Sequence, residues 1–120
     1  MTVGSGKTTS PASNEWLPHV AMSLSAAGNA IGNALAIPVG QDLSIFTTVN
    51  SGQGCQLPLS GVSLGETYQV ANHGSNALLV YPSSNTAKMG TASAGAGYSL
   101  AAGKSAYFTS VGLGSWTTCP

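Results

Sequence analysis

Charged side chains are scarce in this chain of 120 residues. Only 5% of the residues are charged, and three lysines balance three acidic residues, so the formal net charge at pH 7 is zero. Binding of nucleic acid needs enough basic residues to neutralise several phosphates, and we therefore expect no nucleic-acid partner. A neutral surface also lacks the mutual repulsion that keeps chains apart. The composition therefore favours a chain that functions in an assembly.

Long apolar runs are missing as well. The uncharged stretch 16–41 is interrupted by prolines, serines, Asn29 and Asn33, so it offers no run of about 20 apolar residues that could cross a membrane. No apolar stretch follows Lys7, as a signal peptide would require. We therefore expect no membrane partner, and a chain made and assembled in a cytoplasm. With 42% hydrophobic residues and no net charge, it is predicted to fold around a core.

Residue sets that carry catalysis or hold a cofactor are also lacking. Residues 4–9 read GSGKTT, like the end of a phosphate-binding loop, but Met1 stands where that motif needs a glycine and Pro11 follows at once. His19 and His73 are the two histidines, and no GxSxG sequence or carboxylate pair accompanies them. We expect no catalytic residues and no cofactor, and we predict that the chain is not an enzyme.

Cysteine is rare, and the two cysteines do not indicate a metal site. Cys55 and Cys119 lie far apart, and no histidine is close to either in the sequence, so we expect no bound metal. A bridge between them would close a long loop and could stabilise the fold by up to about 4 kcal/mol. A reducing cytoplasm keeps thiols free, however, and we therefore expect both cysteines to be reduced.

The chain does contain a succession of short strand-forming runs. They are bounded by Gly, Asn, Ser or Pro, as β-strands separated by turns are. The runs cover residues 34–39, 43–49, 67–71, 77–81, 98–100, 106–110 and 115–118. Many short strands with glycine-rich turns predict an all-β fold, a small antiparallel β-sandwich or barrel. The length allows one such domain, which we place at residues 26–120.

Residues 67–71 and 77–81 are predicted to pair as a β-hairpin. Between them stand Asn72, His73 and Gly74, which suit left-handed turn geometry, so His73 is interpreted as a turn residue rather than a catalytic base. Alternation along the strands predicts the residues of the inner faces. These are Tyr68, Val70, Val80, Phe108 and Trp116, with either Leu78 or Leu79.

Residues 26–36 repeat the tripeptide Gly-Asn-Ala at a spacing that one helical turn could use. Glycine and asparagine inside a helix each cost up to about 1 kcal/mol relative to alanine, which argues against a stable helix. We expect a turn followed by a strand at 34–39, and Pro38 places that strand at a sheet edge.

The first 25 residues are predicted to form an extended N-terminal arm. Its small polar residues give way to Trp16 and Leu17, an apolar anchor of the kind that an arm docking on a neighbour needs. Packing of Trp16 on its own domain is an equally open alternative. The residues that we expect to contact other subunits or the larger assembly are Trp16, Leu17, Val20, Ile31 and Leu35.

Several segments in a fixed order resemble one protein family. Residues 47–58 read TTVNSGQGCQLP, residues 65–72 and 77–82 read GETYQVAN and ALLVYP, and residues 98–108 read YSLAAGKSAYF before GSW at 114–116. These segments are similar to those of small structural proteins encoded by tailed bacteriophages. The resemblance spans roughly residues 26–117.

The resemblance implies a virion component, commonly a head decoration protein or part of a fibre. The first hypothesis is a capsid decoration (cement) protein, a homotrimer made in the host cytoplasm that binds the major capsid protein on the outer head surface and stabilises it. The alternative is a tail fibre or baseplate module. In that case Tyr81, Tyr98, Tyr107 and Trp116 would stack on a host glycan.

Overall fold

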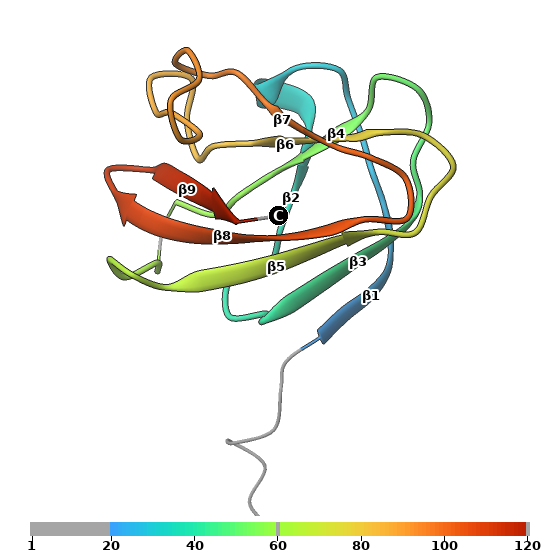
Figure 1. The fold of residues 1–120 in the computed structure, drawn as a ribbon, viewed down its shortest axis with the longest axis horizontal. Helices are drawn as coiled ribbons and strands as arrows, with labels where there is room; N and C mark the ends of the chain where they lie inside the picture. The colour runs from blue at the N-terminus through green and yellow to red at the C-terminus, as the bar shows by residue number, and fades with distance from the viewer. Residues whose placement is uncertain (1–19, 60, 120) are drawn as a thin grey trace, which may run out of the picture.

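The computed structural model describes residues 20–59 and 61–119, and over these residues the chain forms strands and one short 3-10 helix (Figure 1). The elements are β1 (Val20–Ser25), η1 (Ile31–Asn33), β2 (Leu35–Ala36), β3 (Leu43–Thr48), β4 (Gly54–Gln56), β5 (Thr67–Asn72), β6 (Leu78–Tyr81), β7 (Tyr98–Leu100), β8 (Ser105–Gly112) and β9 (Ser115–Cys119). The predicted all-β class is confirmed. The predicted arm lies mostly outside the described residues.

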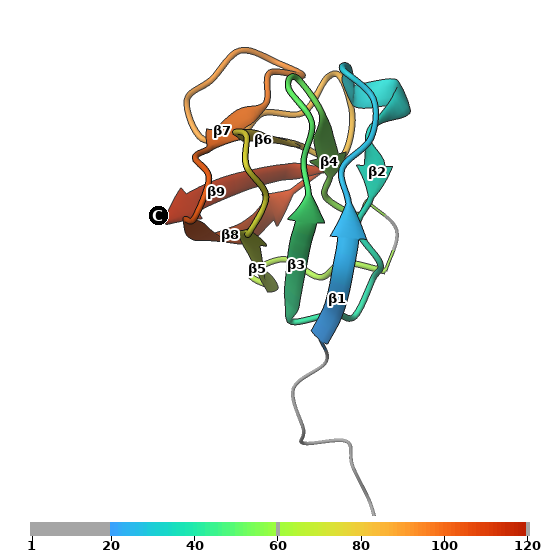
Figure 2. The same ribbon diagram turned by 90° about the vertical axis from the view of Figure 1, so that its right-hand side faces the viewer.

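The strands form two sheets that pack face to face as a sandwich. One sheet has the order β1-β3-β5-β8-β9 and the other the order β2-β4-β6-β7. From β1 to β6 each strand lies in the sheet opposite to the strand before it, so the chain winds as a flattened coil and neighbouring strands run parallel. Figure 2 shows β1 and β3 side by side in the same direction. The last three strands then complete the sheets with antiparallel pairs.

This winding corrects two predictions. The sandwich is not antiparallel throughout. Each turn of the coil enters a given sheet in the same direction as the turn before it, so the neighbouring strands are parallel. Residues 67–71 and 77–81 do not form a β-hairpin, since β5 and β6 lie in different sheets and β5 pairs with β8. The strands were predictable from local composition, but their pairing depends on the path of the connecting segment.

The connection between β5 and β6 crosses from one sheet to the other because Asn72 joins both. The Asn72 side-chain amide donates to the carbonyl oxygen of Leu100 in β7 at 2.9 Å, and its Oδ1 accepts from the Gly74 N–H at 2.9 Å. A Cβ atom on Gly74 would lie 2.7 Å from Val49 Cγ2. Neither His73 nor Gly74 has a positive φ, so the predicted left-handed turn is wrong. Glycine is needed there for close packing.

The core lies between the two sheets. Its buried cluster consists of Ala26, Ile37, Phe46, Val49, Cys55, Leu57, Tyr68, Val70, Leu78, Val80, Met89, Leu100, Ala106, Phe108 and Trp116. Every inner-face residue predicted from alternation is among them, and Leu78 rather than Leu79 takes the core position.

The boundary between arm and domain differs from the prediction. β1 pairs with β3 at the edge of the five-stranded sheet, and Leu24 packs against the core. Residues 20–25, predicted to belong to the arm, are therefore part of the sandwich. After residue 26, a turn and an edge strand are present, because η1 is a single turn and β2 is the outermost strand of its sheet. The strand is shorter than the predicted 34–39, since β2 covers only Leu35–Ala36 and ends before Pro38.

Candidate docking site

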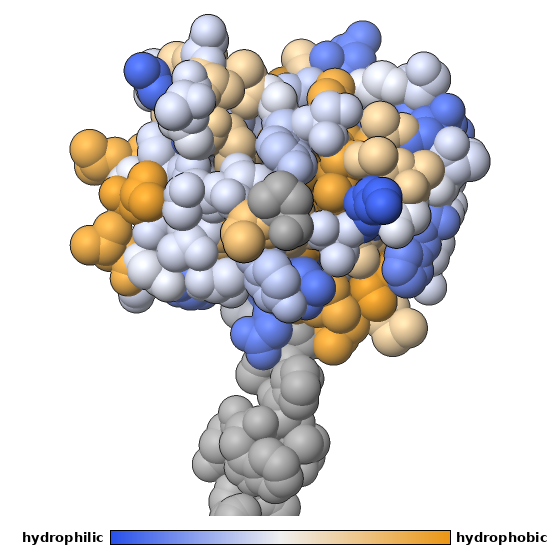
Figure 3. All heavy atoms as spheres, viewed as in Figure 1, coloured by the Kyte–Doolittle hydropathy of each residue, from blue (hydrophilic) through white to orange (hydrophobic). Residues whose placement is uncertain are grey.

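Large apolar side chains gather at the end of the sandwich where β8 turns into β9. Leu113 is 98% exposed, Leu64 is 77% exposed and Leu59 is 56% exposed. Figure 3 shows apolar surface at this end of the molecule, on the left of the view, and a second apolar area at the lower right of centre. Single exposed leucines are ordinary, whereas several together mark an interaction surface. We call these three residues the leucine patch.

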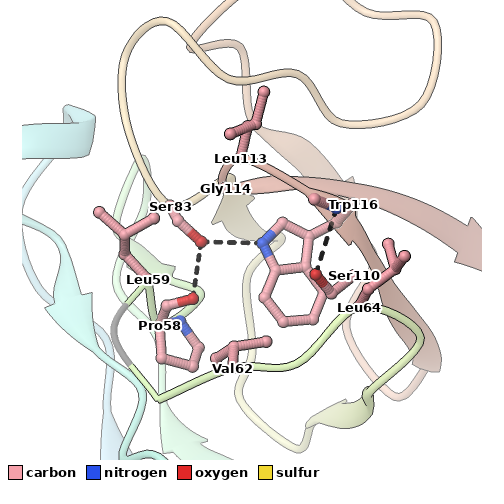
Figure 4. Close-up of a pocket in the computed structure, with 10 residues that line it drawn as sticks. Pro58, Leu59, Val62, Leu64, Ser83, Ser110, Leu113, Gly114 and Trp116 are labelled. Atoms are coloured by element: carbon pink, nitrogen blue, oxygen red, sulfur yellow. Dashed lines mark hydrogen bonds between the residues drawn. The ribbon is translucent and has the colours of Figure 1, made fainter.

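A pocket of about 100 Å³ opens between the three leucines (Figure 4). Its walls include Val62 and Trp116, and Figure 4 shows the leucines placed around the Trp116 indole on three sides. None of the ten residues that line the pocket carries a charge. An apolar group could therefore enter the pocket without removing the hydration of a charged side chain.

Hydrogen bonds within the wall of the pocket hold Trp116 in place. The Trp116 indole N–H donates to Ser83 Oγ at 2.8 Å, and the Ser83 hydroxyl donates to the Pro58 carbonyl at 2.7 Å. The Ser83 backbone N–H donates to the Gly114 carbonyl at 3.0 Å. Tyr68 packs edge-on against the indole, with the ring centroids 5.6 Å apart. Because these polar groups bond to one another, they fix the shape of the wall, whose accessible surface is polar as well as apolar.

Leu113 occupies an unfavourable position in the β8–β9 turn. Gly112 pairs with Ser115, which leaves Leu113 and Gly114 as a two-residue loop. Their φ angles are 56° and 79°, both positive as in a type I′ turn. That turn prefers Asn, Asp or Gly, and a bulky side chain with positive φ is an outlier. Since Leu113 is almost fully exposed, contacts within the chain do not offset the cost.

Burial lowers the reactivity of one of the two cysteines and of one tyrosine. Cys55 is buried in β4 and Cys119 is exposed, and both are free thiols, in agreement with the prediction of a reduced pair. Burial raises the pKa of Cys55. Burial likewise raises the pKa of Tyr68, whose hydroxyl accepts from the Gly40 N–H at 3.0 Å. The thiolate is the reactive form of cysteine, so Cys55 is a poor nucleophile.

The predicted contact residues lie elsewhere than the leucine patch. Val20 is 40% exposed at the start of β1, whereas Ile31 in η1 and Leu35 in β2 are half-buried. Leu35 packs against the core, so most of its side chain is not available to a partner. β1 and β2 are the outer strands at the same end of the two sheets. Trp16 and Leu17 lie outside the described residues.

The aromatic rings expected to bind a glycan do not share a surface. Trp116 and Tyr81 are buried, and Tyr98 packs edge-on against Phe108 with centroids 5.8 Å apart. Of the four rings, only Tyr107 is exposed, at 48%. The arrangement therefore lacks the stacking platform on which the tail-fibre hypothesis depends.

The remaining motifs do not form a second site in the described part of the chain. Residues 4–9 and His19 fall outside it, and His73 is exposed between β5 and β6. In residues 20–59 and 61–119, no three His, Cys, Asp or Glu side chains gather where they could hold a metal ion. Over the same residues, no helix is both long and apolar enough to cross a membrane.

Comparison of the chain with protein-family models, with curated proteins and with solved structures found no match. The leucine patch also does not coincide with the contact residues expected from the sequence. Its local signal is a leucine between two glycines at 112–114, together with Leu59 and Leu64 beside small polar loop residues. Turns ordinarily carry polar residues at such positions.

Proposed function

We propose that this chain is a head decoration (cement) protein of a tailed bacteriophage. It binds the outer surface of the head and stabilises it through contacts between subunits. The resemblance over residues 26–117 supports the family, and the neutral composition supports an assembly. The observation that carries the proposal is the leucine patch, an apolar surface on a chain with almost no charge. The partners are other copies, as a homotrimer, and the major capsid protein.

The energetics of the leucine patch fit such a role. Burying one apolar side chain of this size contributes roughly 1.5–3 kcal/mol. Association costs at least about 4 kcal/mol in lost translational and rotational freedom. Burial of a single leucine does not offset this cost, whereas burial of all three in one contact can. A protein that binds the assembled shell and not its free subunits stabilises the shell by mass action.

The alternative function, a tail fibre or baseplate module that binds glycan, has less support. It requires several exposed rings on one face, and Tyr107 alone among the four candidates is exposed. The exposed leucines have no role in sugar binding, whereas they suit contact with another protein surface.

The direct test is sedimentation of the purified chain with phage heads that lack it. We expect the chain to sediment with the heads, with on the order of hundreds of copies bound to each head, because a repeating shell offers many equivalent sites. Leu64→Asn should reduce the bound amount at least tenfold. Met22→Gln, which changes another exposed apolar residue on β1, serves as the matched control and should bind as the native chain does. Absence of the native chain from the sedimented heads would refute the proposal.

The N-terminal segment provides a separate prediction. Deletion of residues 1–17 removes Trp16 and Leu17, and we expect attachment to heads to weaken while the far-ultraviolet circular dichroism of the β-domain is retained. The same sedimentation measurement decides the point. If the shortened chain coats heads as well as the full chain does, the segment has no part in docking.

A further inference from the structure

We infer that the leucine patch binds a second copy of this chain, with Leu113 of one copy filling the Trp116 pocket of the other. The inference rests on the proposed function, because it takes the leucine patch as a docking surface. It deepens that proposal by naming a second copy of the chain as the partner that binds there. Three observations carry it: the size of the pocket, the geometry of the turn that presents Leu113, and the apolar area of the patch.

The pocket has the size of one aliphatic side chain. Apolar cavities of about 150 Å³ hold a benzene molecule, so a pocket of about 100 Å³ has room for the four side-chain carbons of a leucine. Figure 4 shows that the chain's own Leu113 stands on the rim and is directed away from the pocket. A projecting aliphatic side chain and a cavity of matching size, with no charged residue in its lining, thus lie beside each other on one surface.

The turn geometry indicates that Leu113 is placed there for an external contact. Its φ of 56° is costly for a leucine, and its exposure of 98% means that the folded chain gains nothing from the side chain. Asparagine would fit the same type I′ turn without strain. A residue that breaks the local preference without an internal gain is expected to gain in a complex.

The apolar area of the patch approaches what a small stable interface needs. Leu59, Leu64 and Leu113 together expose more than two complete leucine side chains. A gain of roughly 1.5–3 kcal/mol per side chain at about 25 cal/mol per Å² corresponds to roughly 60–120 Å² for each leucine, so two copies would bury on the order of 300–550 Å² of apolar surface. A small specific interface buries about 1,200 Å² in total, of which roughly 60% is apolar. The three leucines therefore supply a large part of the apolar area, and no charged lining residue opposes the contact.

A second copy is also the occupant that symmetry favours. Because the projecting residue and the pocket are neighbours, a rotation axis beside them lets each copy give one Leu113 and receive another, either across a two-fold axis or around a three-fold ring. The other exposed apolar strand, β1, is less suited to pairing with a copy. Its register with β3 shifts between Ala21 and Leu24, and Ser23 has a φ of 59°. Such bulges blunt the edges of sheets.

The test is sedimentation velocity of the purified full chain over a range of concentrations, without heads. The native chain should sediment as an oligomer. Leu113→Asn should keep the turn, and therefore the fold, while raising the dissociation constant at least tenfold. Leu113→Met keeps a flexible apolar side chain of similar volume and should restore most of the association. Met22→Gln, on β1, should leave the association unchanged.

A native chain that is monomeric at every concentration would overturn the inference, as would Leu113→Asn protein that associates as tightly as the native chain. An equal loss of association in Met22→Gln would do the same. A monomeric chain that still coats heads would overturn only this inference and leave the proposed function standing. A chain that associates through Leu113 but binds no heads would instead refute the proposed function.

Discussion

Individual buried polar atoms in this fold differ in how well they are satisfied. Ser44 Oγ is the one buried side-chain oxygen or nitrogen without a hydrogen-bond partner in the part of the chain that the structure describes. Ser83 Oγ, by contrast, accepts from Trp116 and donates to Pro58. Burying a hydroxyl without a partner costs about 1–3 kcal/mol, and removing one partner of a buried bond costs a similar amount.

These two serines therefore predict opposite effects of the same substitution. Ser44→Ala should raise the free energy of unfolding by about 1 kcal/mol, because it deletes an unsatisfied group. Ser83→Ala should lower it by about 1–3 kcal/mol, because the Trp116 N–H and the Pro58 carbonyl lose their partner. Urea denaturation measures both. A loss of stability in Ser44→Ala as large as in Ser83→Ala would contradict this assignment.

The two cysteines are predicted to differ in reactivity. In the folded chain at pH 8, a thiol reagent such as 5,5′-dithiobis(2-nitrobenzoate) should modify one thiol per chain, Cys119, because burial raises the pKa of Cys55 and keeps the reagent out. Both thiols should react in denaturant. Cys119→Ser should abolish the reaction of the folded chain. Modification of native Cys55 at the rate of an exposed thiol would show that β4 is not buried as described.

At the level of elements, the connection from β5 to β6 is one of the crossings between the sheets that distinguish this fold from a meander of hairpins. The Asn72 amide donates to the carbonyl oxygens of Asn76 at 2.8 Å and Leu100 at 2.9 Å. Asn72→Leu keeps the branched shape of the side chain but leaves these carbonyl groups without partners. We expect a loss of about 3 kcal/mol or more in urea denaturation.

Asn76→Ala is the matched control for this crossing. The Asn76 side chain donates to the Val49 carbonyl at 2.9 Å, but the residue is exposed, so water can replace the bond. The loss should be about 0.5–1.5 kcal/mol. Equal losses in the two variants would mean that Asn72 does not hold the sheets together.

The strands could be predicted from sequence because their signals are local. Residues 43–49 and 106–110 are rich in β-branched or aromatic side chains, and β3 and β8 form there. Asn50 follows the first run directly, and Gly112 ends the second strand two residues beyond its run. β4 carries no such signal, since Gly54, Cys55 and Gln56 have little β preference, and parallel neighbours on both sides hold it in place. Pairing could not be predicted, because the bonds of Asn72 link residues far apart in the chain.

For the molecule as a whole, the buried thiol of Cys55 and the buried phenol of Tyr68 predict how the stability of the fold changes at alkaline pH. The pKa values of Cys55 and Tyr68 are raised in the folded state, chiefly by burial. Their contribution to stability is therefore complete below their ordinary pKa values and is lost as the pH rises above them, because the unfolded chain ionises first. The free energy of unfolding should fall between about pH 9 and pH 11.

Chemical denaturation at stepped pH measures this fall. Cys55→Ala and Tyr68→Phe should each flatten the alkaline slope, whatever their effect at pH 7. A slope that is unchanged in both variants would show that these groups ionise as readily in the folded chain as in the unfolded one.

The docking site could be predicted only in part. The sequence indicated an uncharged, assembling all-β chain, but it directed attention to Trp16, Val20 and Leu35, and Leu35 is packed against the core. Strand alternation predicts Trp116 in the core, where it lies, but its place in the pocket wall depends on Leu59 and on the β8–β9 turn, which the fold alone brings together. Exposure is a property of tertiary structure, and no local pattern determines it.

Whether this chain covers phage heads is tested most directly by an electron-microscopy map of the particle that carries it. We predict this sandwich on the outer surface of the head, at on the order of hundreds of copies, with the β8–β9 ends of neighbouring copies in contact. A map in which the head surface is bare, and the chain is found in the tail or is absent, would contradict the proposal.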